Sequence, residues 1–120
     1  MPRKDSVLRT KAECYAYRII KLYRYVLDKK ETVMSRQIYR SGTSIGANVA
    51  ESTNAQSDAD FVNKLSVALK EANETEYWLK CLFAAGYIDE RGFESMKADN
   101  DELIKMLVCS IKTKKANMTK

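Results

Sequence analysis

Histidine is absent from the 120-residue chain, proline occurs once, and only four residues are glycine. Without histidine the common zinc-ligand sets are nearly excluded, and no serine has an imidazole beside it to act as its base. The three cysteines, Cys14, Cys81 and Cys109, share no C-x-x-C spacing and are expected to be reduced thiols. The sequence therefore predicts a protein that is not an enzyme and that binds no metal and no cofactor.

Long apolar runs are also missing. No segment approaches the roughly 20 apolar residues that a membrane helix needs, and no signal-peptide pattern opens the chain. We therefore expect a soluble, cytoplasmic protein without a membrane partner. A chain of this length forms one domain and can bury about two thirds of its unfolded surface, so it needs no disulfide or metal to support its core.

Apolar residues recur at heptad spacing, and no alternating strand pattern is present. One series consists of Leu8, Ala12, Tyr15, Ile19, Leu22 and Val26, and a second of Phe61, Leu65, Ala68, Ala72, Thr75, Leu79 and Leu82. We predict an all-α fold, an up-down-up-down antiparallel four-helix bundle that forms a single domain over residues 1–120. The predicted helices cover about residues 5–30, 35–54, 58–85 and 89–114, followed by a frayed tail at 115–120.

Residues that favour helix ends support these boundaries. Ser35 is the expected N-cap of the second helix, and Ser57 with Asp60 resembles a capping box at the start of the third. Gly86 is expected to end the third helix because a residue just past a helix end often needs a positive φ. Asp89 is then placed to cap the last helix.

Small residues interrupt the second predicted helix. Gly42, Gly46 and Ala50 repeat every four residues and therefore share one helix face. Glycine costs about 1 kcal/mol relative to alanine inside a helix, so we predict that Gly42 and Gly46 allow close packing against another backbone.

Polar residues on the same helix form a second stripe, which includes Asn48 and Glu51. We interpret this stripe as a hydrogen-bonded network within or between subunits, closed by Arg40 with Glu51 or Glu76. The alternative interpretation is a wall that faces a ligand.

Other side chains fall on faces that a monomeric bundle would keep polar. The third helix carries a stripe that we expect opposite the core, with Val67, Glu71, Glu74, Trp78 and Cys81. The outer side of the second helix is small and flat. We predict an oligomer interface, against the alternative of incidental exposure. Its candidate residues are Trp78, Val67, Ala47, Ala50 and Thr43.

The charge of the chain is uneven. Residues 1–50 carry 11 basic and 4 acidic side chains, residues 51–102 carry 5 basic and 12 acidic, and residues 103–120 carry five lysines and no acid. In the predicted topology both termini lie at one end of the bundle. The basic residues expected to gather there are Arg3, Lys4, Arg9, Lys11, Lys112, Lys114, Lys115 and Lys120.

Residues 40–51, with the sequence RSGTSIGANVAE, resemble the signature of the small four-helix-bundle proteins encoded in intervening sequences of bacterial 23S ribosomal RNA genes. Further matching segments follow in order, at residues 54–57, 60–61, 64–69, 76–79 and 86–87, and the likeness covers about residues 6–113. The resemblance implies a ring of five subunits. It also implies kinship with the accessory variability protein of diversity-generating retroelements, a basic pentamer that binds nucleic acid and works with a reverse transcriptase.

We therefore predict a non-enzymatic oligomer, a pentamer by resemblance, with an RNA-binding or accessory role. The residues predicted to bind nucleic acid are Lys21, Arg24, Arg36, Arg40, Tyr17 and Tyr25. Cations would contact phosphates and the two tyrosines would stack on unpaired bases. The alternative function is a protein-interaction scaffold that binds no nucleic acid, because the acidic residues 51–102 weaken the case for RNA. No small-molecule substrate is expected.

Overall fold

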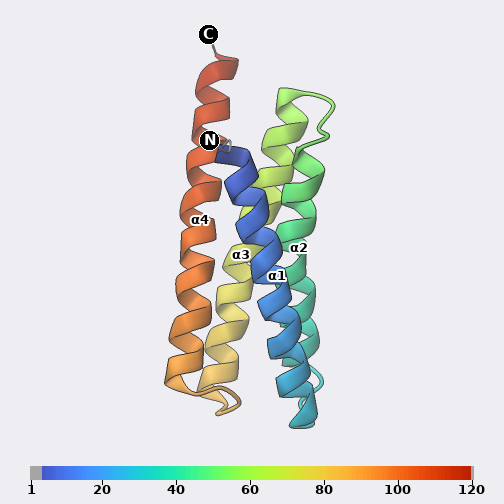
Figure 1. The fold of residues 1–120 in the computed structure, drawn as a ribbon, viewed down its shortest axis with the longest axis vertical. Coiled ribbons are helices and arrows are strands. Elements are labelled where there is room, and N and C mark those ends of the chain that lie inside the picture. Colours follow the sequence, from blue (N-terminus) through green and yellow to red (C-terminus); the bar gives the residue numbers. More distant parts are fainter. Residues whose placement is uncertain (1–3, 120) are drawn as a thin grey trace.

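The computed structural model describes residues 4–119 as four helices, with no strand in that range. These helices are α1 (Lys4–Asp28), α2 (Met34–Ser52), α3 (Asp58–Ala84) and α4 (Glu90–Met118). They run alternately up and down the long axis, and the start of α1 and the end of α4 lie toward the same end of the bundle (Figure 1). The predicted all-α four-helix bundle is confirmed.

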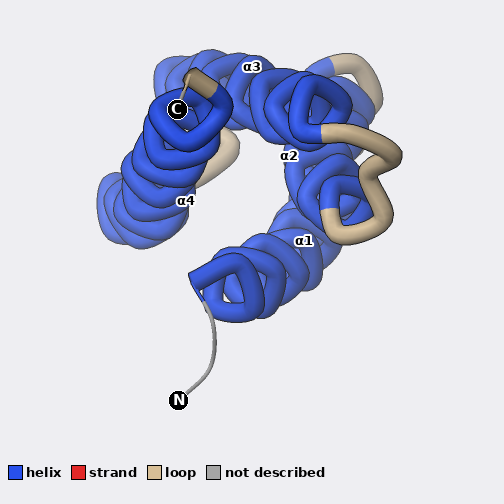
Figure 2. Tube along the Cα trace, turned by 90° about the horizontal axis from the view of Figure 1, so that it is seen from above, coloured by secondary structure: helices blue, strands red, loops and turns tan. Residues whose placement is uncertain are grey.

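The heptad series form the core. All members of the first series except Leu22, and all members of the second except Phe61, are buried, and these two residues pack against the core at its edge. Seen from above, the helices follow one another in the order α1, α2, α3, α4 (Figure 2). Of the neighbouring pairs, α1 and α4 contact each other least. The bundle is therefore closed on three sides and more loosely joined on the fourth.

Three of the four predicted helix-end signals are confirmed. The Ser57 hydroxyl accepts the Asp60 N–H at 3.0 Å, and the Asp89 carboxylate accepts the Gly92 N–H at 2.7 Å. Gly86 follows the end of α3 with a φ of +83°, a conformation that glycine adopts without strain.

The prediction for Ser35 is wrong, because α2 begins at Met34 and Ser35 is buried within its first turn. The Glu31 carboxylate takes the capping role and accepts the N–H groups of Val33 at 3.0 Å and Ser35 at 2.8 Å. Burial alone would raise the pKa of Glu31, but these backbone donors lower it below its ordinary value. A charged carboxylate is also favoured beside the positive end of a helix.

The predicted frayed tail is also corrected. The helix α4 continues to Met118, four residues beyond the expected end at 114. Its last turns extend past the rest of the bundle (Figure 1), and residues 115–119 are exposed. Each residue that extends an existing helix adds a backbone hydrogen bond, and lysine and alanine favour helix, so these turns form without a packing partner. Among residues 4–119, no helix combines the length and apolar character needed to cross a bilayer.

Candidate interaction surfaces

The glycines of α2 lie against α1. A Cβ added to Gly46 would stand 3.2 Å from the backbone carbonyl oxygen of Ala12, and one added to Gly42 would stand 2.6 Å from the Ile19 side chain. At Gly46 the two backbones thus approach closely, whereas at Gly42 the free space is filled by the Ile19 side chain. These glycines set the short distance between α1 and α2.

Outside this contact, a shallow groove of about 260 Å³ runs between α1 and α2. Its lining includes Tyr17 from α1 and Thr43, Ala47 and Ala50 from α2. The Tyr17 hydroxyl donates to the Glu13 carboxylate at 2.6 Å, and this hydrogen bond raises the pKa of Tyr17. Three residues predicted at an oligomer interface therefore share one surface with a tyrosine predicted to bind nucleic acid.

The predicted stripe on α3 does not lie opposite the core. Glu71 is buried, and Trp78 packs against the edge of the core. Arg40 from α2 forms ion pairs with Glu71, at 3.0 Å, and with Glu74. The Trp78 indole N–H donates to Glu74 at 3.2 Å. The expected outward face is thus an internal contact between α2 and α3, and Val67 beside it is half-buried.

Arg40 therefore does not close the predicted polar network. Glu51 pairs instead with Lys64 at 3.2 Å, and Glu76 pairs with Lys80 at 3.2 Å. The Asn48 amide donates to the backbone carbonyl of Ser44 at 2.9 Å. Within the described chain the three predicted network residues have separate partners, because each points toward a different neighbour.

The remaining predicted RNA-binding cations are accessible. Lys21, Arg24 and Arg36 are exposed, and none of them pairs with a carboxylate among the described residues. The rings of Tyr23 and Tyr39 lie 4.7 Å apart. This contact brings the part of α1 that carries Arg24 beside the part of α2 that carries Arg36.

The predicted basic end is only partly free. Lys11 pairs with Glu102 at 2.6 Å, and Lys114 pairs with Asp58 at 3.4 Å. Arg3 and Lys120, and the side chain of Lys4, lie outside the described residues.

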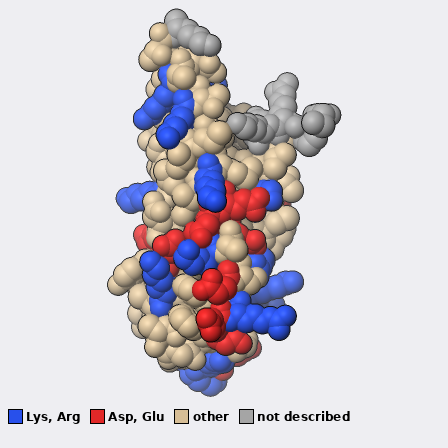
Figure 3. Space-filling model, turned by 90° about the vertical axis from the view of Figure 1, so that its left-hand side faces the viewer, with Lys and Arg blue, Asp and Glu red and all other residues tan. Residues whose placement is uncertain are grey.

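On the face that α4 occupies, basic side chains are separate from acidic ones near the upper end of the molecule and alternate with them in the middle (Figure 3). This face therefore carries no continuous basic surface.

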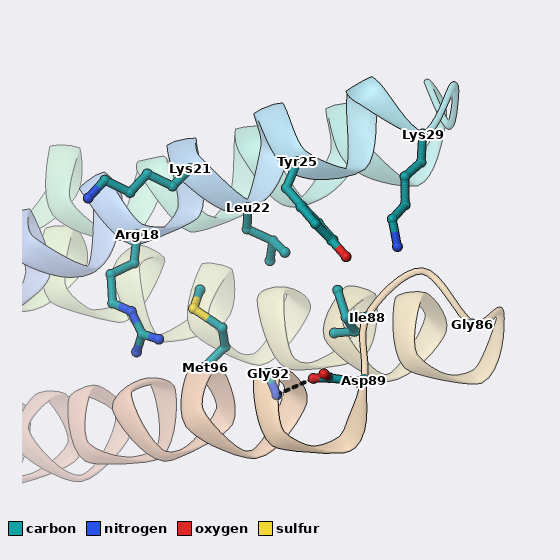
Figure 4. Close-up of a pocket in the computed structure, with 10 residues that line it drawn as sticks. All are labelled: Arg18, Lys21, Leu22, Tyr25, Lys29, Gly86, Ile88, Asp89, Gly92 and Met96. Atoms are coloured by element: carbon teal, nitrogen blue, oxygen red, sulfur yellow. Dashed lines mark hydrogen bonds between the residues drawn. The ribbon is translucent and has the colours of Figure 1, made fainter.

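Lys21 and Tyr25 also line a pocket between α1 and α4, which has a volume of about 620 Å³. Leu22 and Tyr25 project into it from α1, and Ile88 and Met96 face them from the loop before α4 and from α4 itself (Figure 4). A smaller pocket of about 300 Å³ lies further along the same two helices, beside Cys14 and Asp99.

Within residues 4–119 no group of acidic or cysteine side chains has an arrangement that could hold a metal ion.

Exposed aromatic residues on α2 and α3 were missed in the predictions from the sequence. Tyr77 and Tyr39 expose 58% and 41% of their surface, whereas Trp78, which was predicted to face outward, is half-buried. Successive residues on a helix point about 100° apart. An error of this order in the rotation assigned to α3 therefore exchanges Tyr77 and Trp78.

The sequence model of the 23S rRNA-intervening sequence protein family matches residues 4–109 of the chain. The protein belongs to this family. The chain is also similar to a protein of known structure from Bacteroides thetaiotaomicron VPI-5482, which belongs to the S23 ribosomal protein family and has no known function. The two are 52% identical, the match covers 92% of this chain and 99% of the other, and the TM-score is 0.90. A search of curated proteins found no match.

Membership confirms the resemblance that residues 40–51 indicated. In the structure of this intervening-sequence protein, the residues of that segment have different roles. Gly42 and Gly46 hold α1 close, Arg40 joins α2 to α3, and Thr43, Ala47 and Ala50 line the outer groove. Ser41 is buried and accepts a hydrogen bond from Thr75 at 2.9 Å. The signature of the chain is therefore mainly a set of packing contacts of α2.

Proposed function

We propose that this intervening-sequence protein is a non-enzymatic, oligomeric accessory protein that binds RNA. The observation that carries the proposal is the outer surface of α1 near its C-terminus. Lys21 and Arg24 are exposed there without a carboxylate partner in the described chain, next to Tyr25, which is 52% exposed. Free cations beside an exposed aromatic ring are the groups that contact phosphates and stack on bases.

Arg36 on α2 extends this surface, and we leave Arg40 out of it. The guanidinium of Arg40 is held by Glu71 and Glu74, so a phosphate would have to displace two carboxylates. Tyr17 lies beside α2 in the small-residue groove and is also left out. The proposed surface therefore consists of Lys21, Arg24, Tyr25 and Arg36.

Oligomerisation is the second part of the proposal. The groove floored by Gly46, Ala47 and Ala50 allows close approach of another chain, and Tyr39 and Tyr77 are large exposed side chains suited to an interface. The number five rests on the family resemblance alone. Light scattering at micromolar concentration should report a multiple of the 13.7 kDa chain. A 13.7 kDa particle would contradict assembly, and a dimer or tetramer would contradict only the number.

RNA binding is tested by titrating the protein with single-stranded and structured RNA at increasing salt. The logarithm of the affinity should fall with the logarithm of the salt concentration, with a slope of about −0.7 for each phosphate neutralised on a single strand. The double variant Lys21→Glu/Arg24→Glu should abolish most of the binding at low salt. Lys70→Glu, which changes an exposed lysine on α3, is the matched control and should bind like the parent protein.

A protein-interaction scaffold is the second candidate function. It is favoured by the ion pairs that occupy Lys11, Arg18, Arg40, Lys64, Lys80, Lys97 and Lys114 within one chain. Because these lysines and arginines are already paired with carboxylates, fewer of them are free to contact phosphates than the number of basic residues in the sequence suggests. Undetectable RNA binding at low salt, or full binding by the Lys21→Glu/Arg24→Glu variant, would favour the scaffold.

A further inference from the structure

The pocket between α1 and α4 has the size and lining of a ligand site. Its volume of about 620 Å³ falls within the range of small-molecule pockets, about 300–1,000 Å³. Leu22 and Ile88 face each other across it, and Met96 forms part of its wall from the α4 side (Figure 4). The interior of the pocket is apolar and lies between the polar surfaces of two helices, so it can accommodate a flat, weakly polar group.

Positive charge surrounds this interior. Lys21 is exposed at one end and has no ionic partner in the described chain, whereas Arg18 is already paired with Asp99 at 2.6 Å. At the other end the Lys29 ammonium donates to the Tyr87 carbonyl oxygen at 3.2 Å. The one acid in the lining is Asp89, whose carboxylate accepts the Gly92 N–H at 2.7 Å. The charge balance of the rim favours an anionic occupant.

Tyr25 supplies a surface for stacking. Its ring projects from α1 toward the pocket (Figure 4), and the Lys29 nitrogen lies 4.5 Å from the ring centroid, over one face. A planar ligand would therefore stack on the opposite face. With the Lys29 cation in place, Tyr25 is still 52% exposed, so part of its surface is open to a ligand.

We propose that this pocket holds one unstacked base of single-stranded RNA, with the adjoining phosphates beside Lys21 and Lys29. The inference rests on the proposed RNA-binding function and specifies where and in what form the RNA binds. A base in a duplex is stacked on both faces and cannot enter, so the site selects single strands. The stacking is tolerant of base identity because every base presents a π-face.

The test compares a short oligouridylate with a strand of the same length that lacks bases. Tyr25→Ala should weaken oligouridylate binding about tenfold, within the range measured for base–aromatic stacking. The same substitution should leave binding of the abasic strand unchanged, because that strand has only phosphates to offer. Tyr25→Phe keeps the ring and should bind both strands like the parent protein. Since Tyr25 is exposed, circular dichroism should show all variants folded.

Three outcomes would overturn the inference. If Tyr25→Ala binds oligouridylate normally while Lys21→Glu/Arg24→Glu does not, RNA contacts only the outer cations, and the proposed function stands without the pocket. If the parent protein binds no RNA at low salt, the proposed function fails and the pocket assignment fails with it. If polyglutamate competes as well as oligouridylate does, the site accepts any polyanion and selects no base.

Discussion

The two neighbours of α1 are held to it by different chemistry. Against α2, small residues bring the backbones together, with Gly46 facing the Ala12 carbonyl group. Against α4, long charged side chains span the distance, as in the Lys11–Glu102 and Arg18–Asp99 pairs. The α1–α2 contact is therefore closely packed, whereas the α1–α4 contact encloses two pockets.

This difference suggests how one bundle can provide both stability and binding. Interiors are packed densely, and a contact between backbones leaves no room for a ligand. Exposed ion pairs add little stability and leave space between helices. We infer that the α1–α2 contact supports the fold and that the looser α1–α4 contact is available for binding.

The largest expected effect comes from overfilling the α1–α2 contact. Gly46→Leu should push α1 away from α2 and destabilise the fold by about 1–3 kcal/mol or more, because overpacked side chains force the backbone to shift. Chemical denaturation measures the free energy of unfolding, and light scattering measures assembly. Ala98→Leu adds similar bulk at an exposed position of α4 and should change little. A Gly46→Leu protein that melts and assembles like the parent would refute the close-packing role.

An intermediate effect is expected at a buried polar link between α1 and α4. The Tyr15 hydroxyl, in a residue only 2% exposed, donates to the Met96 carbonyl oxygen at 3.1 Å. Tyr15→Phe should lower the free energy of unfolding by about 1 kcal/mol at neutral pH. An unchanged free energy would mean that the hydrogen bond gives no net stability.

The same residue predicts a dependence on alkaline pH. Burial raises the pKa of Tyr15 above its ordinary value of 10.0. Its folded form therefore holds the proton more tightly than its unfolded form, so its stabilising contribution is complete below pH 10 and is lost as the pH rises above it. Denaturation at rising alkaline pH should show a smaller loss of stability in Tyr15→Phe than in the parent. Equal losses in both proteins would exclude Tyr15 as the group responsible.

The smallest effect is expected at the charged surface of the α1–α4 contact. Arg18 and Asp99 are 40% and 46% exposed, and such pairs contribute about 0.2–1 kcal/mol. A double-mutant cycle with Arg18→Ala and Asp99→Ala should give a coupling in this range that shrinks with added salt. A larger, salt-independent coupling would show that ion pairs hold the α1–α4 contact more firmly than we infer.

Much of the fold was predictable because it depends on local spacing. Heptad positions such as Leu65 and Leu79 identified the core, and Ser57, Gly86 and Asp89 marked helix ends through their own hydrogen bonds or φ preference. The start of α2 was not predicted correctly, since Ser35 and Glu31 are both able to cap and the helix begins one residue before Ser35.

The surfaces were less predictable because they depend on two helices at once. Spacing placed Arg40 outside the core, but its pairing with Glu71 and Glu74 depends on how α3 is rotated and shifted beside α2. The same rotation decided that Tyr77 is exposed and Trp78 half-buried. The α1–α4 pocket also needs the loop that carries Ile88, and no pattern in α1 alone predicts it.

By itself the sequence determined the four helices, their buried faces and the family, because periodicity and motif are properties of one chain segment. The tertiary structure decided which cations remain free, which aromatic residues are exposed and where a pocket opens. These features depend on the distance and rotation between helices. Packing sets both quantities, since small residues such as Gly46 draw one pair together and the side chains between α1 and α4 keep the other pair apart.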